Sequence, residues 1–471
     1  MKKVNIFLKE EYYKRTRFGY IIALLICLMI RAVGCYLFAP PVIEICVFSA
    51  LGLAGAFLIL WGLLIKNIEL NFRKYFFQII FLVCIVISSI VNIKYGFFRN
   101  LKDFLWMSIS FFVLFLATNK VSRREKYKFL VTIQNIVIYT WLVLSFISLI
   151  TFLLQINYIF HIREGCWVGI GSVEGRLFGI FLNPNTASII SLISIIFSIF
   201  QLVSKTEFSA KKFINISNIV VQFSYIVLAE SRGTALVMIF CVFLVTFSVA
   251  YKKLNFRNIY KIIFALLIAA ISCVAVFLSM KFLNWLFYCL AKFVQEINPY
   301  FSEKKSKNIS VQRTDYIENN DISNLRFRIW LSAWEIFKKN WLFGVSSGNV
   351  VEYAKDVLPE TFIAKRSYAR AHSVWIGLPL YTGIAGALSM YAFFAMNFFK
   401  TCKHYFKNYF LVKIKVYDGM LMVSALLTGA ICVYGLVESE LFFVNSICSL
   451  IFWVYFGFLV DNLKSNKKLE I

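Results

Sequence analysis

The sequence predicts an all-α polytopic membrane protein with about 12 transmembrane helices and one large extracytoplasmic loop. Hydrophobic residues make up 60% of the 471-residue chain, and its mean hydropathy is +0.74. Soluble domains contain only about 45 to 50% apolar residues. The apolar residues fall in runs long enough to cross a bilayer, and lysine and arginine concentrate in alternate loops.

Windows of about 18 or more mostly apolar residues predict twelve helices. The first follows a basic segment but lacks a small-residue cleavage site, so we interpret it as a retained helix rather than a signal peptide. Most of the 11 cysteines lie inside apolar runs and are interpreted as small core residues. The helices are expected at residues 19–38, 42–65, 75–92, 103–118, 129–155, 177–203, 213–229, 233–251, 260–288, 373–399, 416–437 and 441–460.

The basic residues of the short loops predict the orientation of the chain. The alternate segments that include both termini hold 29 lysines and arginines, whereas the other short loops hold six. Both termini are therefore expected in the cytoplasm. The net charge of +26 reflects this topology and attraction to anionic lipid, so it gives little support to nucleic-acid binding.

Three regions follow from this topology. Residues 1–288 are expected to hold the first nine helices, residues 289–372 an extracytoplasmic loop subdomain, and residues 373–471 the last three helices and a cytoplasmic tail. Within the loop, residues 323–340 predict a helix that Ser323 or Asn324 can cap, and its tryptophans favour the membrane interface. One face of this helix is expected to carry Arg326, Trp330, Ala333, Trp334 and Phe337.

Arginines at helix ends are the first candidate binding residues. Arg176 opens the predicted span 177–203, which Asn183, Pro184 and Asn185 interrupt; a proline kink or carbonyls facing a watery cavity explains this pattern. Arg232 lies in the tight turn "AESRGTA", for which an ion pair or a solvated turn is an equal explanation. The topology assigns to one outer face Arg176, Arg232, Arg326, Arg370 and His372.

These residue types suit phosphate binding and proton transfer. Arginine forks bind phosphate oxygens bidentately, so the cluster suits a lipid-linked diphosphate. Histidine is the side chain best suited to take a proton from a hydroxyl at neutral pH, which makes His372 a candidate base; a lone histidine at a helix entrance is more often an interfacial residue. Glu438 and Glu440 are candidate sugar-binding residues, and a solvated turn explains them equally well. No CxxC or HExxH spacing is present, so no metal site is predicted.

Ordered motifs from about residue 170 to about residue 440 resemble the O-antigen ligase and polymerase family of bacterial surface-polysaccharide enzymes. "RLFGIFLNPN" is similar to that family's arginine-glycine-asparagine helix opening, and "SRGTAL" to its Ser-Arg-Gly turn. "RFRIWLSAWEIFKKNWLFGVSSGN" resembles its Arg-x3-Trp helix and aromatic-Gly turn, and "AHSVWIGLPLYTGIAG" its histidine before a Gly-x2-Gly helix. Two departures are Ser373, where the family commonly has Asn, and the wider spacing of Gly344 and Gly348.

The resemblance implies a GT-C-like glycosyltransferase of the bacterial cytoplasmic membrane that acts on its outer face and needs no metal or other cofactor. Its donor would be a polyprenyl-diphosphate-linked oligosaccharide, and its acceptor a glycan hydroxyl. His372 would be the general base, Arg176, Arg232 and Arg326 would hold the diphosphate, and Arg370 is a further candidate. Direct attack on the anomeric carbon predicts inversion, because no carboxylate pair is spaced for a glycosyl-enzyme intermediate.

Two further functions stay open. A repeat-unit polymerase for capsule, O-antigen or exopolysaccharide is preferred over a ligase that transfers glycan to lipid A-core, because the composition is compatible with an AT-rich genome and a Gram-positive cell would lack lipopolysaccharide. A lipid-linked oligosaccharide flippase or transporter is the alternative from another class, although Arg31, Glu44 and Lys281 are the only conspicuous charges within the predicted spans. Membrane lipids are expected partners, chain-length regulators and flippases are candidate partners, and no nucleic acid is expected.

Overall fold

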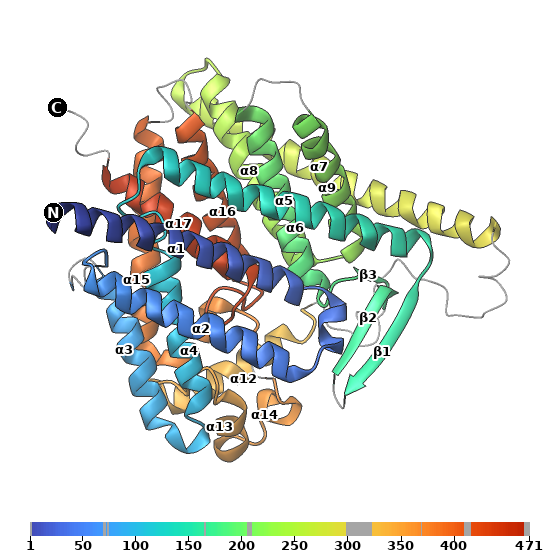
Figure 1. Cartoon of the computed structure of the whole chain (residues 1–471). Helices are drawn as coiled ribbons and strands as arrows, with labels where there is room; N and C mark the ends of the chain where they lie inside the picture. Colours follow the sequence, from blue (N-terminus) through green and yellow to red (C-terminus); the bar gives the residue numbers. More distant parts are fainter. Residues whose placement is uncertain are drawn as a thin grey trace.

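A computed structural model of the chain is a bundle of long helices with a small sheet and a helical subdomain at one end (Figure 1). The structure describes residues 2–68, 72, 75–163, 166–204, 210–297, 323–368, 370–408 and 416–465. Residues 298–322 of the predicted extracytoplasmic loop lie outside this described part.

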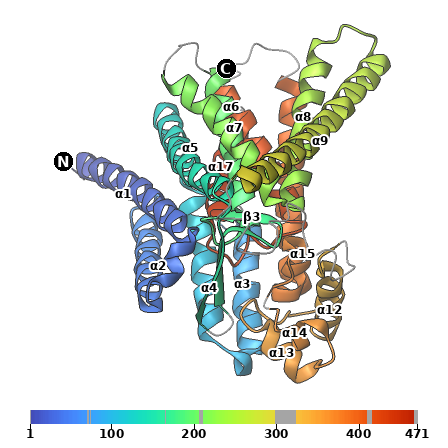
Figure 2. The same cartoon turned by 90° about the vertical axis from the view of Figure 1, so that its right-hand side faces the viewer.

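Each of the twelve predicted apolar segments contains a helix. The first six are α1 Lys2–Arg31, α2 Pro41–Leu64, α3 Phe76–Val91, α4 Phe98–Ile109, α5 Arg123–Leu153 and α6 Pro184–Ser204. The last six are α7 Ala210–Ala229, α8 Arg232–Lys253, α9 Asn258–Ile297, α15 Val374–Asn408, α16 Val416–Tyr434 and α17 Ile447–Ser465. Short turns of helix are η1 Gly34–Phe38, η2 Ile93–Tyr95 and η3 Ser110–Leu114. Figure 2 shows α8 and α9 leaving the bundle together as an antiparallel pair.

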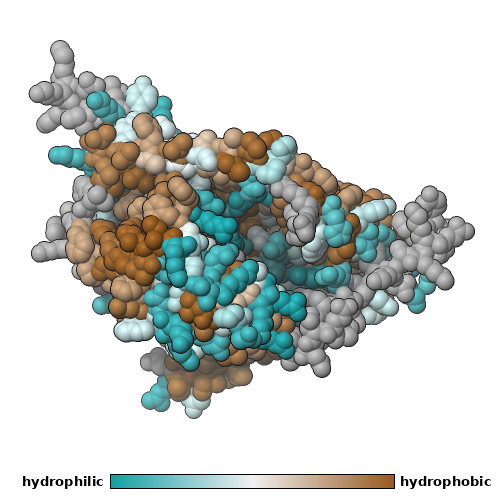
Figure 3. Space-filling view, turned by 90° about the horizontal axis from the view of Figure 1, so that it is seen from below, coloured by the Kyte–Doolittle hydropathy of each residue, from teal (hydrophilic) through white to brown (hydrophobic). Residues whose placement is uncertain are grey.

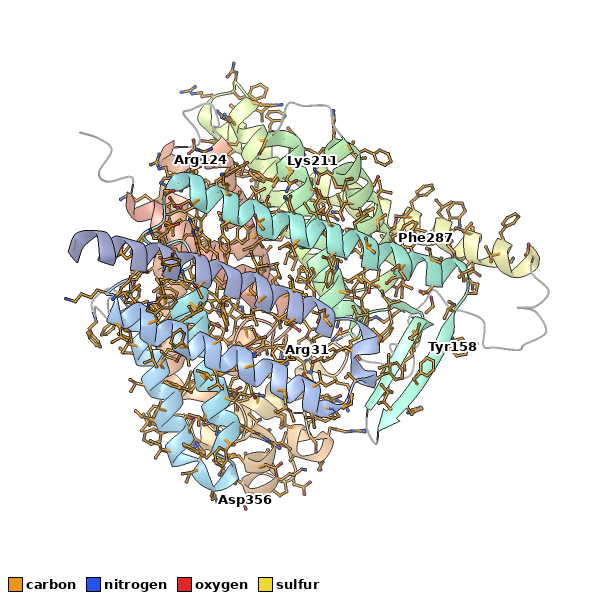
Figure 4. The ribbon with its side chains drawn as sticks, in the orientation of Figure 1. Arg31, Arg124, Tyr158, Lys211, Phe287 and Asp356 are labelled. Atoms are coloured by element: carbon orange, nitrogen blue, oxygen red, sulfur yellow. The ribbon has the colours of Figure 1, made fainter. Side chains whose placement is uncertain are left out.

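The lengths and composition of these helices confirm an all-α polytopic membrane protein. Eight of the described helices are long and apolar enough to cross a membrane, namely α2, α5, α6, α7, α8, α9, α15 and α16. Apolar stretches of α3 and α17 are shorter, at 10 to 17 residues, and α4 has only 12 residues. The basic residues Arg124 and Lys211 lie at one end of the bundle, and Asp356 of the subdomain lies at the opposite end (Figure 4). We call this opposite end the subdomain face.

A three-stranded antiparallel sheet precedes α6. The predicted helix 177–203 is therefore wrong at its start, because residues 177–179 belong to a strand. The strands of the sheet, in spatial order, are β1 Asn157–Arg163, β2 Cys166–Val173 and β3 Arg176–Gly179. Val173 pairs with Arg176 across a two-residue turn, in which Glu174 and Gly175 have φ of 52° and 71°. Two consecutive positive φ angles are the mark of a tight hairpin turn whose twist suits antiparallel strands. Arg176 therefore begins a strand and does not open a membrane span.

The sequence Asn183-Pro184-Asn185 begins α6 instead of interrupting a helix. The side-chain oxygen of Asn183 accepts a hydrogen bond from the backbone N–H of Asn185 at 2.8 Å, which caps the helix. Pro184 occupies the first helical position, where its missing N–H removes no intrahelical hydrogen bond. Both explanations offered for this sequence, a kink and unpaired carbonyls within a span, are therefore wrong. The capped start instead fixes Asn185 in the first turn of α6.

The subdomain contains α12 Arg326–Lys339, α13 Val350–Val357 and α14 Phe362–Arg366. The hydroxyl of Ser323 accepts a hydrogen bond from the N–H of Phe327 at 3.3 Å, at the start of α12. Of the residues expected on one face of α12, Ala333 and Phe337 are buried, whereas Trp334 is 51% exposed. The buried residues of α12 are Ile329, Ser332, Ala333, Ile336 and Phe337. Of these, Ile329, Ala333 and Ile336 pack in a separate apolar core with residues of α13, α14 and the start of α15.

Two glycines allow the subdomain to dock closely on α15. Gly344 and Gly383 have φ of 69° and 68°, a backbone conformation that side chains with Cβ rarely adopt. A Cβ on Gly344 would lie 2.5 Å from the nitrogen of Gly383, and a Cβ on Gly383 would lie 2.1 Å from the carbonyl oxygen of Leu342. The contact fixes the subdomain beside the start of α15, the region that follows His372.

Candidate active site

The carboxylate of Glu438 joins residues from three distant parts of the chain. Glu438 lies between α16 and α17, and its side chain is only 13% exposed. Its Oε1 accepts hydrogen bonds from Nη2 of Arg326 at 2.7 Å and from Nδ2 of Asn185 at 3.0 Å. Its Oε2 lies 3.5 Å from Nδ1 of His372. We call Asn185, Arg326, His372 and Glu438 the Glu438 cluster.

Arg326 reaches the cluster from the first position of α12. Its side chain is 20% exposed, so its ion pair with Glu438 is largely shielded from solvent. The Nε of Arg326 is buried and has no hydrogen-bond partner among the described residues. The same holds for Nε1 of Trp330, one turn further along α12. Two buried donors of α12 thus have their hydrogen-bonding capacity unused among the described residues, although buried donors are usually paired.

His372 is held by the backbone on both sides of it. The N–H of Ala371 donates to the hydroxyl of Tyr381 at 3.1 Å, and the N–H of Val374 donates to the carbonyl of Gly435 at 2.8 Å. His372 itself has a φ of 47°, and its side chain is 39% exposed. Because Nδ1 faces Glu438, Nε2 is the ring nitrogen left for a further partner. Ser373, where the family commonly has Asn, is buried near the start of α15.

Arg176 contacts the Glu438 cluster through Asn185. It is 9% exposed, its Nε donates to the carbonyl of Ala229 at 3.0 Å, and its Nη2 donates to Oδ1 of Asn185 at 2.5 Å. Asn185 in turn donates to Glu438. Arg176 is therefore linked to Glu438 through Asn185 rather than by direct contact. This arrangement fixes the amide of Asn185 so that its nitrogen points at the carboxylate.

Glu440 occupies a different environment from Glu438, two residues away. Its Oε1 accepts a hydrogen bond from Thr186 at 3.1 Å, whereas its Oε2 is buried and has no partner among the described residues. Burial and the neighbouring Glu438 charge raise the pKa of Glu440. Burial also raises the pKa of Glu438, but His372 and Arg326 outweigh it and hold that pKa below the ordinary value. Environments that separate two carboxyl groups in this way are typical of sites where the two have different tasks.

The remaining predicted arginines lie at the edge of this site. Arg370 is exposed, and its positive charge is close enough to Glu440 to oppose the rise in the pKa of that carboxyl group. Arg232 is exposed at the first position of α8, and the hydroxyl of Ser231 caps that helix. The next residue, Gly233, packs against Val437, the neighbour of Glu438. Seen from the subdomain face, hydrophilic side chains surround a hollow in the molecular surface (Figure 3).

The sequence did not predict the central place of Glu438 or the involvement of Asn185. Asparagine before proline is a helix-start signal, so the sequence around Pro184 is sufficient to predict that Asn185 lies in the first turn of a helix. No local pattern links Glu438 to Arg326, which is 112 positions away. Arg31, noted only as a charge within a span, contacts the carbonyl of Asn445 and lies 3.7 Å from Glu44.

These features define a class, a multi-pass helical membrane protein with a site of arginine, histidine and carboxylate side chains at one end of its bundle. Residues 217–391 match the family model described as O-antigen ligase. The match supports the predicted assignment to the O-antigen ligase and polymerase family, and it includes Arg232, Arg326 and His372. Arg176 and Glu438 lie outside the matched range. A comparison with curated protein sequences gave no match.

Proposed function

We propose that the chain is a polymerase of polyprenyl-diphosphate-linked oligosaccharide repeat units, acting at the subdomain face on the outside of the bacterial cytoplasmic membrane. The observation that supports it best is the convergence of Arg326 and His372 on one buried carboxylate. A phosphate-binding group and a candidate base thus lie within reach of a single bound substrate. The family match supports the same general activity, glycosyl transfer of the ligase and polymerase type.

The proposed reaction is a direct, metal-independent displacement at the anomeric carbon. Nε2 of His372 takes the proton of the acceptor hydroxyl, whose oxygen forms the new bond to the anomeric carbon. The bond from that carbon to the diphosphate oxygen breaks, and the diphosphate leaves with the electron pair. Positive charge fixed in advance near the leaving group stabilises the transition state. Attack opposite the leaving group inverts the anomeric carbon.

The arginines divide into two groups in this proposal. Arg326, with its unused Nε, contacts the diphosphate, and the exposed Arg232 and Arg370 add positive charge at the edge of the site. Arg176 positions Asn185, because two of its donors are already bound to protein oxygens. Glu440, whose Oε2 has no partner among the described residues, accepts a hydrogen bond from an acceptor sugar hydroxyl.

Deletion of the gene followed by gel analysis of surface glycan tests the proposal. A polymerase mutant retains single repeat units and loses long chains. The second candidate is a ligase that transfers glycan to lipid A-core, which the name of the matched family, O-antigen ligase, favours. Its mutant accumulates unattached polymer on the lipid, and lipid-linked units trapped inside the cell would indicate a flippase.

Reporter fusions test the proposed location. A fusion within residues 289–372 should report a position outside the cytoplasmic membrane, and fusions at both termini should report the cytoplasm. A cytoplasmic signal from the 289–372 fusion would overturn the proposed orientation and with it the side on which transfer takes place.

A further inference from the structure

Glu438 is the only carboxylate in the described part of the chain that contacts Arg326 or His372. Its loop is fixed at both ends: the carbonyl of Gly435 accepts from Val374 at 2.8 Å, and the carbonyl of Glu440 accepts from the hydroxyl of Ser446 at 2.9 Å. A buried carboxylate needs opposite charge or hydrogen-bond donors to remain ionised. Glu438 therefore depends on the partners that the proposed reaction would use.

The two oxygens of Glu438 are used unequally. Oε1 receives two donors at 2.7 and 3.0 Å, which are ordinary hydrogen-bond lengths. Oε2 lies 3.5 Å from Nδ1 of His372, longer than a normal hydrogen bond between nitrogen and oxygen. The carboxylate is thus mainly the counterion of Arg326, and its hold on His372 is loose.

Binding of a diphosphate changes this balance. The anion competes with Glu438 for the guanidinium of Arg326, and it places a like charge near the buried carboxylate. Asn185 still donates to Oε1, and the donor that faces Oε2 is Nδ1–H of His372. A small displacement of either side chain shortens this contact, because the two groups already face each other.

We propose that Glu438 is a positioning residue that couples donor binding to the base: it neutralises Arg326 before the diphosphate binds and holds His372 afterwards. This inference rests on the proposed function. As Nε2 takes the proton of the acceptor hydroxyl, the imidazole becomes an imidazolium, and Nδ1–H donates to Glu438. The carboxylate stabilises that cation and fixes the tautomer without taking up a proton itself, as acidic partners of catalytic histidines do.

The substitution Glu438→Gln separates this role from a structural one. The amide group removes the charge that competes with the anion, so the isolated protein in lipid nanodiscs should bind farnesyl diphosphate about three- to tenfold more tightly than wild type. The same variant should lower polymer formation in cells about a hundredfold or more, because an amide N–H facing Nδ1 favours the wrong histidine tautomer. A merely structural role would weaken both binding and polymer formation.

Two comparison variants sharpen the test. Glu360→Gln removes an exposed carboxylate of the same subdomain that pairs with Lys365, and it should change neither measurement. Arg326→Ala should weaken binding of farnesyl diphosphate. Weaker binding by Glu438→Gln, or full polymer formation by that variant, overturns the inference. If instead deletion of the gene leaves long glycan chains in place, the proposed function itself fails, whatever Glu438→Gln does.

Discussion

Two polar regions of this molecule differ in charge and in how completely their side chains are hydrogen-bonded. The first, which we call the bundle network, joins neutral side chains of α5, α6 and α7 inside the bundle. Gln222 accepts from Ser145 at 2.8 Å and donates to Asn218 at 2.9 Å, and Asn218 donates to Ser194 and Ser198 at 2.9 and 2.8 Å. The second region, the Glu438 cluster, is charged, and Nε of its Arg326 has no hydrogen-bond partner in the described residues.

This contrast distinguishes a structural network from a binding site. In the bundle network every side-chain oxygen and amide nitrogen of Asn218 and Gln222 has at least one hydrogen-bond partner within the bundle. In the Glu438 cluster Nε of Arg326 has no partner among the described residues, and neither has Oε2 of Glu440, two residues from Glu438. A buried polar group without a partner costs about 1–3 kcal/mol. Such a cost is typical of sites where a ligand completes the hydrogen bonds.

The largest expected effect tests whether the Glu438 cluster carries the chemistry. His372→Ala should lower polymer formation by about a hundredfold or more while the protein level in the membrane stays normal, because the base is lost and the fold is not. Gel analysis of surface glycan and immunoblotting of membranes measure both. His161→Ala is the matched control, since His161 is exposed on β1. Full-length polymer from His372→Ala would exclude a catalytic role for this histidine.

A smaller loss is expected when the charge at position 326 is kept and its shape changed. Arg326→Lys removes the planar fork that can bind two phosphate oxygens, so polymer formation should fall about ten- to a hundredfold. Arg328→Lys is the control, because Arg328 is exposed on the same helix. Equal polymer yields from the two variants would show that only charge matters at position 326.

How much the sequence predicts differs between the two regions. Hydropathy predicted all twelve helical segments, because a run of apolar residues is visible in a short stretch of sequence without knowledge of distant residues. It failed at residues 176–183, where apolar residues continue through a strand and only the Glu174-Gly175 turn marks the break. The site residues of the matched family range were named from motifs. Their common partner Glu438 was not, since hydrogen bonds between residues 112 or more positions apart leave no local pattern.

The bundle network should respond in the opposite way to the Glu438 cluster. Asn218→Leu removes the amide that joins α7 to two serines of α6, and it should destabilise the protein by about 1–2 kcal/mol. Thermal unfolding in nanodiscs measures this change. Ser272→Ala is the control, because Ser272 is partly exposed and its hydroxyl donates to Ile268 within α9. Polymer formation per folded molecule should stay at the wild-type level, and its selective loss would place the bundle network in the active site.

The smallest expected effect is a dependence of stability on acid. The folded protein holds the pKa of Glu438 below the ordinary value of 4.5, so the unfolded chain binds the proton first as the pH falls. The stabilisation from Glu438 is therefore complete above about pH 4.5 and is lost as the pH falls through its folded pKa. Glu440 has the opposite sign, because its raised pKa makes the folded state bind the proton first. Unfolding temperatures between about pH 6 and pH 3.5 should consequently fall less steeply for Glu438→Gln than for wild type, and more steeply for Glu440→Gln. The neutral bundle network predicts no such change for Asn218→Leu, so equal slopes for all four proteins would mean that the ion pair of the Glu438 cluster does not stabilise the fold.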